Sequence, residues 1–106
     1  DVAAQGFRVL ARHDLAAAMA KAGIEREPYL VVEVCNARIA AAVLAADPRI
    51  GALLPCRIAV YQEGDETVLT TVLPTRLIGL FPDAGVAEHA AQVDQAMRAM
   101  VDAAAG

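Results

Sequence analysis

The stretch from Tyr29 to Tyr61 constrains the fold more than any other part of the chain. It begins with a short apolar run, Tyr29–Val34, in which five of six residues are strand formers. This run is too short for a buried helix, so it predicts a strand. An alanine-rich segment, Ala37–Ala46, follows and predicts a helix with Asn36 as its N-cap, and a second apolar run, Arg57–Gln62, predicts another strand. A strand, a helix and a strand in this order indicate a domain that combines both kinds of structure.

The rest of the chain supplies further elements of the same size. Phe7–Arg12 alternates apolar and polar residues as a strand does, and Glu63–Glu66 reads as a hairpin turn leading to a return strand, Thr67–Val72. Shorter helices are predicted from Leu15 to Ala22, with Asp14 as the N-cap, and from Pro74 to about Gly79. The longest predicted helix runs from Val86 to Ala104. Its apolar stripe consists of Val86, Ala90, Val93, Met97, Met100 and Val101.

Composition limits the class of protein. At 106 residues the chain is expected to form one domain, with a core of Val, Leu, Ile and 25 alanines. The net charge is −4 and the cations are scattered, which argues against sequence-independent nucleic-acid binding. No apolar run approaches the ~18 residues of a membrane span. We therefore expect a cytoplasmic protein with no nucleic-acid or membrane partner, in which both cysteines are free thiols.

Several short motifs, taken in order, resemble one known family. They are Gly6-Phe7, Cys35-Asn36 after the Tyr29–Val34 strand, Ala46-Asp47-Pro48, Ile50-Gly51, Leu53-Leu54-Pro55-Cys56 and Val60-Tyr61. Their order and spacing, over roughly Gln5 to Phe81, resemble the family catalogued as domain of unknown function 302, in its cysteine-containing branch.

The resemblance implies an α+β fold: a small antiparallel-rich sheet of about four strands, with helices packed on it and a long C-terminal helix. It also implies a homodimer. The family has no established activity to transfer to this chain, and the cofactor stays unknown. Family members begin with a strand and a helix that precede the position of Gly6. Because Val2–Gln5 reads as the last turn of a longer helix, we expect about 25 further residues upstream, enough for one strand and one helix.

Cys35 and Cys56 are the main candidates for a functional site. Cys35 comes just before a helix N-terminus, whose backbone N–H groups favour a thiolate, and Cys56 opens a strand after a proline. A redox pair, a metal or persulfide site, or a thiolate facing a ligand would all use such residues. The alternative is that both cysteines are small buried hydrophobes.

The distance between the two thiols depends on the topology. If the flanking strands form a right-handed parallel crossover, Cys35 ends one strand and Cys56 begins the next. The two would then lie a strand length apart, roughly 17–20 Å. A connector Asp47–Pro55 that runs back along the sheet would instead bring them together.

Glu33 is the one carboxylate inside an apolar strand. It either pairs with Arg57, at the start of the next predicted strand, or faces a cleft as an acid/base group. His13 and His89 have no companion at metal-ligand spacing, so both are expected to be surface or capping residues, and no metal site is predicted.

Three functional hypotheses remain open. In the first, a homodimeric binding or accessory module holds a small molecule or ion in a pocket near Glu33, Cys35, Asn36 and Cys56. In the second, a thiol-dependent enzyme or carrier handles sulfur, a metal ion or redox equivalents through the two cysteines. In the third, the long C-terminal helix serves structural assembly and neither thiol is needed.

Overall fold

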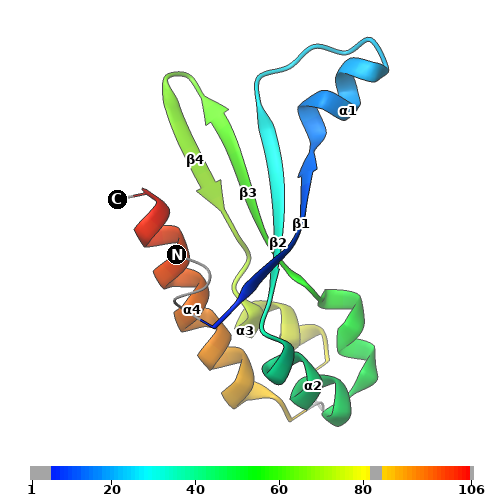
Figure 1. Cartoon of the computed structure of the whole chain (residues 1–106). Coiled ribbons are helices and arrows are strands. Elements are labelled where there is room, and N and C mark those ends of the chain that lie inside the picture. The colour runs from blue at the N-terminus through cyan, green and yellow to red at the C-terminus, as the bar shows by residue number, and fades with distance from the viewer. Residues whose placement is uncertain (1–5, 82–84, 106) are drawn as a thin grey trace.

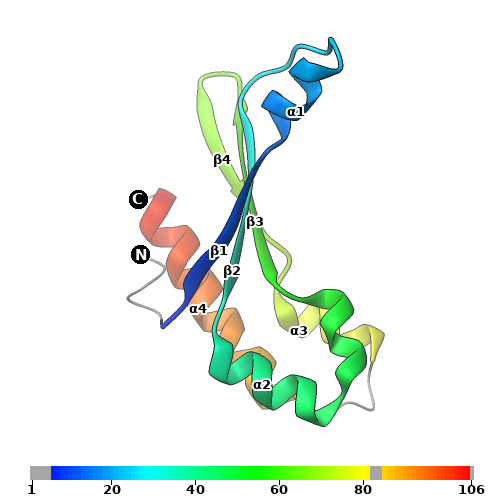
Figure 2. The ribbon, with the colours of Figure 1, turned by 45° about the vertical axis from the view of Figure 1, so that its right-hand side comes forward.

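The computed structural model describes residues 6–81 and 85–105. It consists of one four-stranded sheet with a long helix on one face, several short helices at one end and one further short helix at the other end (Figures 1 and 2). In chain order its elements are β1 (Arg8–Asp14), α1 (Leu15–Lys21), β2 (Tyr29–Cys35), α2 (Ala37–Ala46), the 3₁₀ helix η2 (Pro48–Leu53), β3 (Cys56–Glu63), β4 (Glu66–Thr70), α3 (Pro74–Leu77), the 3₁₀ helix η3 (Ile78–Leu80) and α4 (Ala87–Ala105).

Capping residues and apolar patterns in the sequence predicted most of these elements. Asp14 caps α1 by accepting a hydrogen bond from the backbone N–H of Ala17 at 2.8 Å, and α2 has the predicted bounds. Gly64, with φ of 63°, takes the left-handed conformation at the first position of the β3–β4 turn, where a side chain would be strained. The sequence did not predict η2. The predicted helix end at Val2–Gln5 lies outside the described residues.

The sheet has the order β1-β2-β3-β4, and every neighbouring pair is antiparallel. This confirms the α+β fold with an antiparallel sheet, and it shows that the parallel crossover between β2 and β3 was wrong. The connection between two neighbouring antiparallel strands starts and ends at the same end of the sheet. The segment made of α2 and η2 therefore leaves the sheet at the end of β2 and returns to the same end at the start of β3. No helix within residues 6–81 and 85–105 is long and apolar enough to cross a membrane.

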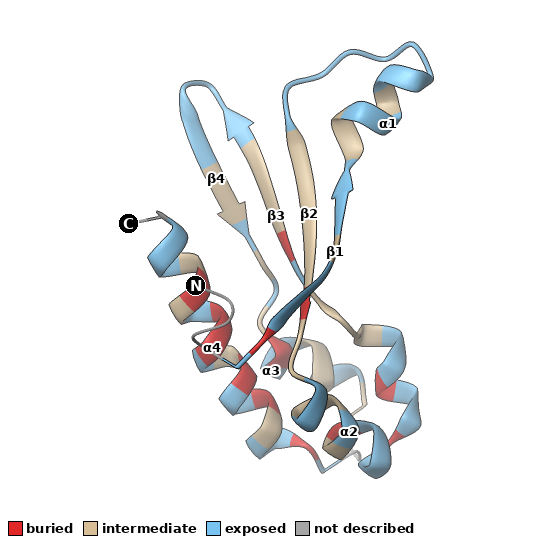
Figure 3. Cartoon of the chain, in the orientation of Figure 1, coloured by how far each residue is buried: buried red, intermediate tan, exposed pale blue. Residues whose placement is uncertain are grey.

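The core lies where α4 crosses one face of the sheet (Figure 3). Met97 and Val34 are both fully buried at its centre, surrounded by Phe7, Ile58 and Met100. The predicted stripe of α4 is therefore confirmed as a core-facing surface. A second cluster, built on Val43, Ile50 and Val86, joins α2 and η2 to the start of α4.

The other end of the sheet projects away from these helices as an arm, which we define as residues 12–31 and 60–68 (Figure 1). The arm comprises α1, the outer halves of the strands and the β3–β4 turn. None of the residues in these two ranges is buried. The radius of gyration, 15.1 Å, exceeds the value of about 13 Å expected for a compact domain of this length. The arm therefore has no core of its own.

Candidate functional site

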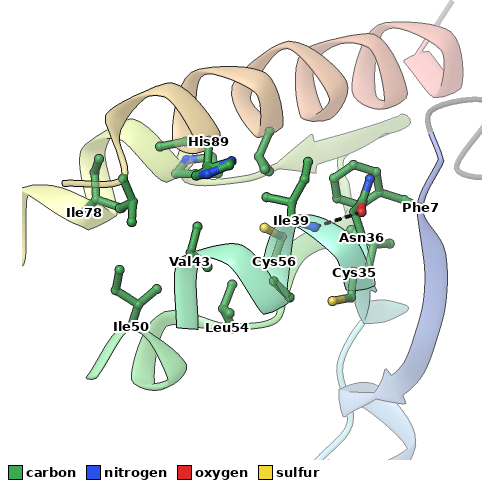
Figure 4. A pocket seen from close by; sticks show the side chains of 16 residues that line it. Phe7, Cys35, Asn36, Ile39, Val43, Ile50, Leu54, Cys56, Ile78 and His89 are labelled. Carbon is green, nitrogen blue, oxygen red and sulfur yellow. Dashed lines mark hydrogen bonds between the residues drawn. The ribbon is translucent and has the colours of Figure 1, made fainter. Parts of the chain in front are cut away.

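The two cysteines lie at a small cavity between the inner end of the sheet and the helices. We call this space the thiol cavity (Figure 4); its volume is about 50 Å³. Its lining comes from the ends of β2 and β3, from α2 and η2, and from α4 on the opposite side. Most of the lining is apolar and includes Phe7, Val34, Ile39, Ala40, Val43, Leu54 and Val93. The polar side chains in the lining are those of Cys35, Asn36, Cys56 and His89.

The antiparallel register brings the two cysteines together. Cys56 is the direct partner of Val34 across the β2–β3 pair, so Cys35 is one residue beyond that partner. Since successive side chains of a strand alternate between faces, the two cysteines leave the sheet on opposite faces, although both line the cavity. Both side chains are partly buried, and both are free thiols. The separation of roughly 17–20 Å expected for a parallel crossover is therefore wrong, because it placed the two residues at opposite ends of neighbouring strands.

Cys56 is a protonated thiol at neutral pH. Burial raises the pKa of Cys56 above its ordinary value of 9.0, and the nearby Cys35 and Asp94 raise it further. A thiolate here would lose hydration and gain no opposite charge. The cavity wall at Cys56 is therefore uncharged.

Asn36 lines the cavity, but its side-chain oxygen is already engaged. It accepts hydrogen bonds from the backbone N–H groups of Arg38 at 3.1 Å and Ile39 at 3.2 Å, which makes it the N-cap of α2. This confirms the predicted cap. Asn36 thus fixes the first residue of α2 and, with it, the position of the preceding residue, Cys35, in the cavity lining.

Glu33 is not among the cavity residues. Its carboxylate accepts a hydrogen bond from His13 Nε2 at 2.8 Å and pairs with Arg57 Nε at 3.3 Å. The hydrogen bond from His13 lowers the pKa of Glu33, and the charge of Arg57 adds to that effect. The structure therefore realises the predicted Glu33–Arg57 pair and separates Glu33 from the other three candidate residues.

His89 is the cavity residue that the sequence interpretation missed. It lies in the first turn of α4 and faces the cavity from the side opposite Cys35 (Figure 4). The helical spacing could have predicted this position. His89 is three residues after Val86 and four before Val93, so it lies on the same helix face as these two members of the apolar stripe. Among the residues that the structure describes, no three His, Cys, Asp or Glu side chains are grouped so that they could hold a metal ion.

η2 closes the cavity and is held by one ion pair. Asp47 is buried, caps η2 and binds the Arg49 guanidinium through both carboxylate oxygens. The hydrogen bond from Arg49 lowers the pKa of Asp47. Because Ile50 and Leu54 line the cavity, this pair positions one of its walls.

Comparison with known proteins agrees with this fold. A family model described as domain of unknown function DUF302 matches residues 1–104. The crystal structure of an uncharacterized conserved DUF302 protein from Bacillus stearothermophilus is similar to this chain, with 32% sequence identity and a TM-score of 0.89. The similarity covers 95% of this chain and 80% of that chain. No curated protein matches. The chain belongs to the DUF302 family.

Proposed function

From membership of a family with no assigned activity, and from the thiol cavity, we propose a small-molecule binding or accessory module that works as a homodimer. The observation that carries the proposal is the apolar cavity itself, which has two free thiols in its lining. Small-molecule sites are typically concave and mostly apolar, with a few polar groups that fix orientation.

The size of the cavity supports a very small ligand. A space of about 50 Å³ is one third of the engineered apolar cavities of ~150 Å³ that bind benzene or xenon. We therefore propose an occupant of only a few non-hydrogen atoms. Leaving such a space empty costs about 1 kcal/mol at ~24 cal/mol per Å³, a cost that one larger side chain would remove.

The chemistry of the lining supports an uncharged occupant. Cys56 is protonated, the Asn36 oxygen is engaged in the helix cap, and the remaining wall is largely apolar. An ion entering this space would lose its hydration without a fixed opposite charge. Of the small molecules or ions considered from the sequence, the structure favours a neutral, mainly apolar molecule.

A pair of matched variants tests the binding site. Ala40 lines the cavity from α2, whereas its neighbour Ala41 is exposed on the same helix. Ala40→Val should fill the cavity, and Ala41→Val carries the same change in helix propensity without filling it. Xenon, used as an apolar probe, should shift the methyl NMR signals of Val43 and Val93 in the wild type and in Ala41→Val. The shifts should be lost in Ala40→Val.

Absence of xenon-induced shifts in the wild type would refute the binding site. Equal shifts in all three proteins would place the xenon elsewhere. Native mass spectrometry of untreated protein would then identify any molecule that the cavity retains on purification.

A second candidate function is a thiol-dependent enzyme or carrier, and the presence of Cys35 and Cys56 in the lining of one cavity favours it. Since Cys56 is protonated at neutral pH, Cys35 would have to act as the nucleophile. Alkylation rates measured on Cys56→Ser test this directly. Reaction of Cys35 at neutral pH faster than in the unfolded chain supports thiol chemistry, and a slower reaction removes it.

A further inference from the structure

The walls of the thiol cavity differ in how firmly they are held. β2 and β3 are joined by the hydrogen bonds of the sheet, and α4 is anchored in the core by Met97 and Met100. α2 packs against both core clusters through Ile39. α3 is tied to α4, because the backbone N–H and the hydroxyl of Thr75 donate hydrogen bonds to Asp94. Each of these walls is therefore fixed by contacts with other parts of the fold.

η2 is the wall with the fewest attachments. Within Pro48–Leu53 only Ile50 is buried. A 3₁₀ helix has poorer hydrogen-bond geometry than an α-helix, and six residues is a long run for one. The backbone N–H of Ile50 donates to the carbonyl of Asp47 at 3.1 Å, and that of Leu54 donates to the carbonyl of Gly51 at 3.3 Å. Segments with few buried apolar contacts open at the lowest free energy, so η2 is the wall that opens most easily.

Arg49 holds η2 against its neighbours. Its guanidinium binds both carboxylate oxygens of Asp47, at the end of α2, and lies 4.8 Å from the centre of the Phe81 ring, just after η3. Phe81 packs on the second cluster, which contains Ile50. Across the part of the chain that the structure describes, no other side-chain hydrogen bond or cation–π contact of η2 reaches a different element. The Arg49 side chain is 60% exposed, so it fastens the cluster from the surface.

From these observations we infer that η2 is a lid on the thiol cavity and that Arg49 is its latch. When Arg49 separates from Phe81 and Ile50 leaves the second cluster, the wall formed by Ile50 and Leu54 opens. Figure 4 shows this wall on the side of the cavity opposite His89. The main core stays intact during the opening, because it contains no residue of η2. This inference rests on the proposed binding site and adds the route by which a ligand reaches it.

Hydrogen exchange tests the lid without any ligand. Arg49→Ala removes the latch, and Arg38→Ala removes an exposed arginine from α2 as the matched control. In Arg49→Ala the amides of Ile50 and Leu54 should exchange about 10-fold faster than in the wild type, the combined effect of an ion pair and an exposed cation–π contact. The amide of Ala40, within α2, should exchange at the wild-type rate in both variants.

A second variant separates the latch from the cap of η2. Phe81→Leu keeps an apolar side chain in the second cluster and leaves the pair of Asp47 and Arg49 in place. It removes only the aromatic face under the guanidinium. The amides of Ile50 and Leu54 should then exchange about 2- to 5-fold faster, since an exposed cation–π contact alone has this effect.

Xenon kinetics show whether the lid is the entrance. A latch sets the rates of entry and exit and leaves the closed cavity unchanged. The association and dissociation rates of xenon, taken from exchange broadening of the Val43 and Val93 methyl signals, should therefore both rise about 10-fold in Arg49→Ala. The dissociation constant should stay at the wild-type value. A role in cavity shape alone would change the dissociation constant instead.

Unchanged exchange of Ile50 and Leu54 in both latch variants would overturn the lid, and so would an equal acceleration at Ala40, because α2 would then open with η2. Xenon rates that Arg49→Ala leaves unchanged would exclude η2 as the entrance. A wild type that binds no xenon refutes the proposed binding site, while hydrogen exchange still decides whether η2 opens. Failure of the lid and failure of the binding site are therefore distinguishable.

Discussion

Replacing Met97 by alanine measures how much one buried side chain between the sheet and α4 contributes to the free energy of unfolding. Met97 is 0% exposed and belongs to the core cluster that also contains Phe7, Val34 and Ile58. The change removes three side-chain heavy atoms, worth about 0.8 kcal/mol each in transfer free energy, and leaves a void worth about 1 kcal/mol more. We expect the free energy of unfolding to fall by about 3–4 kcal/mol.

Urea denaturation followed by circular dichroism gives this value. With a slope near 1.5–2 kcal/mol per molar urea, the midpoint should drop by about 2 M. Protein concentration must be the same in all samples, since the proposed homodimer would contribute to apparent stability. Gln95→Ala, on the exposed side of α4, is the control and should change stability by less than about 0.5 kcal/mol. A loss below about 1 kcal/mol for Met97→Ala, with an unchanged slope, would refute the placement of Met97 at the centre of the core.

Four further measurements test the helix cap, the Glu33 ion pair and the two thiols. Asn36→Ala should cost about 1 kcal/mol in thermal or urea unfolding because α2 loses its cap, and Asn36→Asp should restore most of it; equal losses would argue against capping. The pKa of Glu33 is lowered in the folded state, so its stabilisation is present above the unfolded value near 4.5 and is lost as pH falls through the folded value. Glu33→Gln should therefore flatten the decline of melting temperature between pH 6 and pH 3, and an unchanged decline would contradict this. Because burial raises the pKa of Cys56, its alkylation at pH 8 in Cys35→Ser should be slower in native than in unfolded protein, and equal rates would show an accessible, unperturbed thiol. Denatured, non-reduced wild type should still titrate as two free thiols.

The candidate site was only partly predictable. Cys35, Asn36 and Cys56 were identified from their positions at element ends, and the structure places all three in the wall of one cavity. Glu33 was grouped with them as a carboxylate inside an apolar strand that would either face a cleft or pair with Arg57, and it pairs with Arg57 and also with His13. His89 was missed because it enters the cavity from α4, a helix far away in the chain.

Local chemistry encoded in the sequence determined where most strands and helices begin and end. Asp14 and Asn36 cap their helices through hydrogen bonds within three residues, and the stripe on α4 follows from helical periodicity. These interactions depend only on neighbouring residues, so they can be identified from the sequence.

Only the tertiary structure decided which side chains meet. Strand direction and register set the positions of Cys35 and Cys56, since reversing a strand moves a residue to the opposite end of the sheet and a one-residue slip turns it to the other face. The thiol cavity and the uncovered arm arise in the same way. Both depend on how far α4 extends over the sheet and on where α2 packs at its end, and both are fixed by packing between segments remote in the chain.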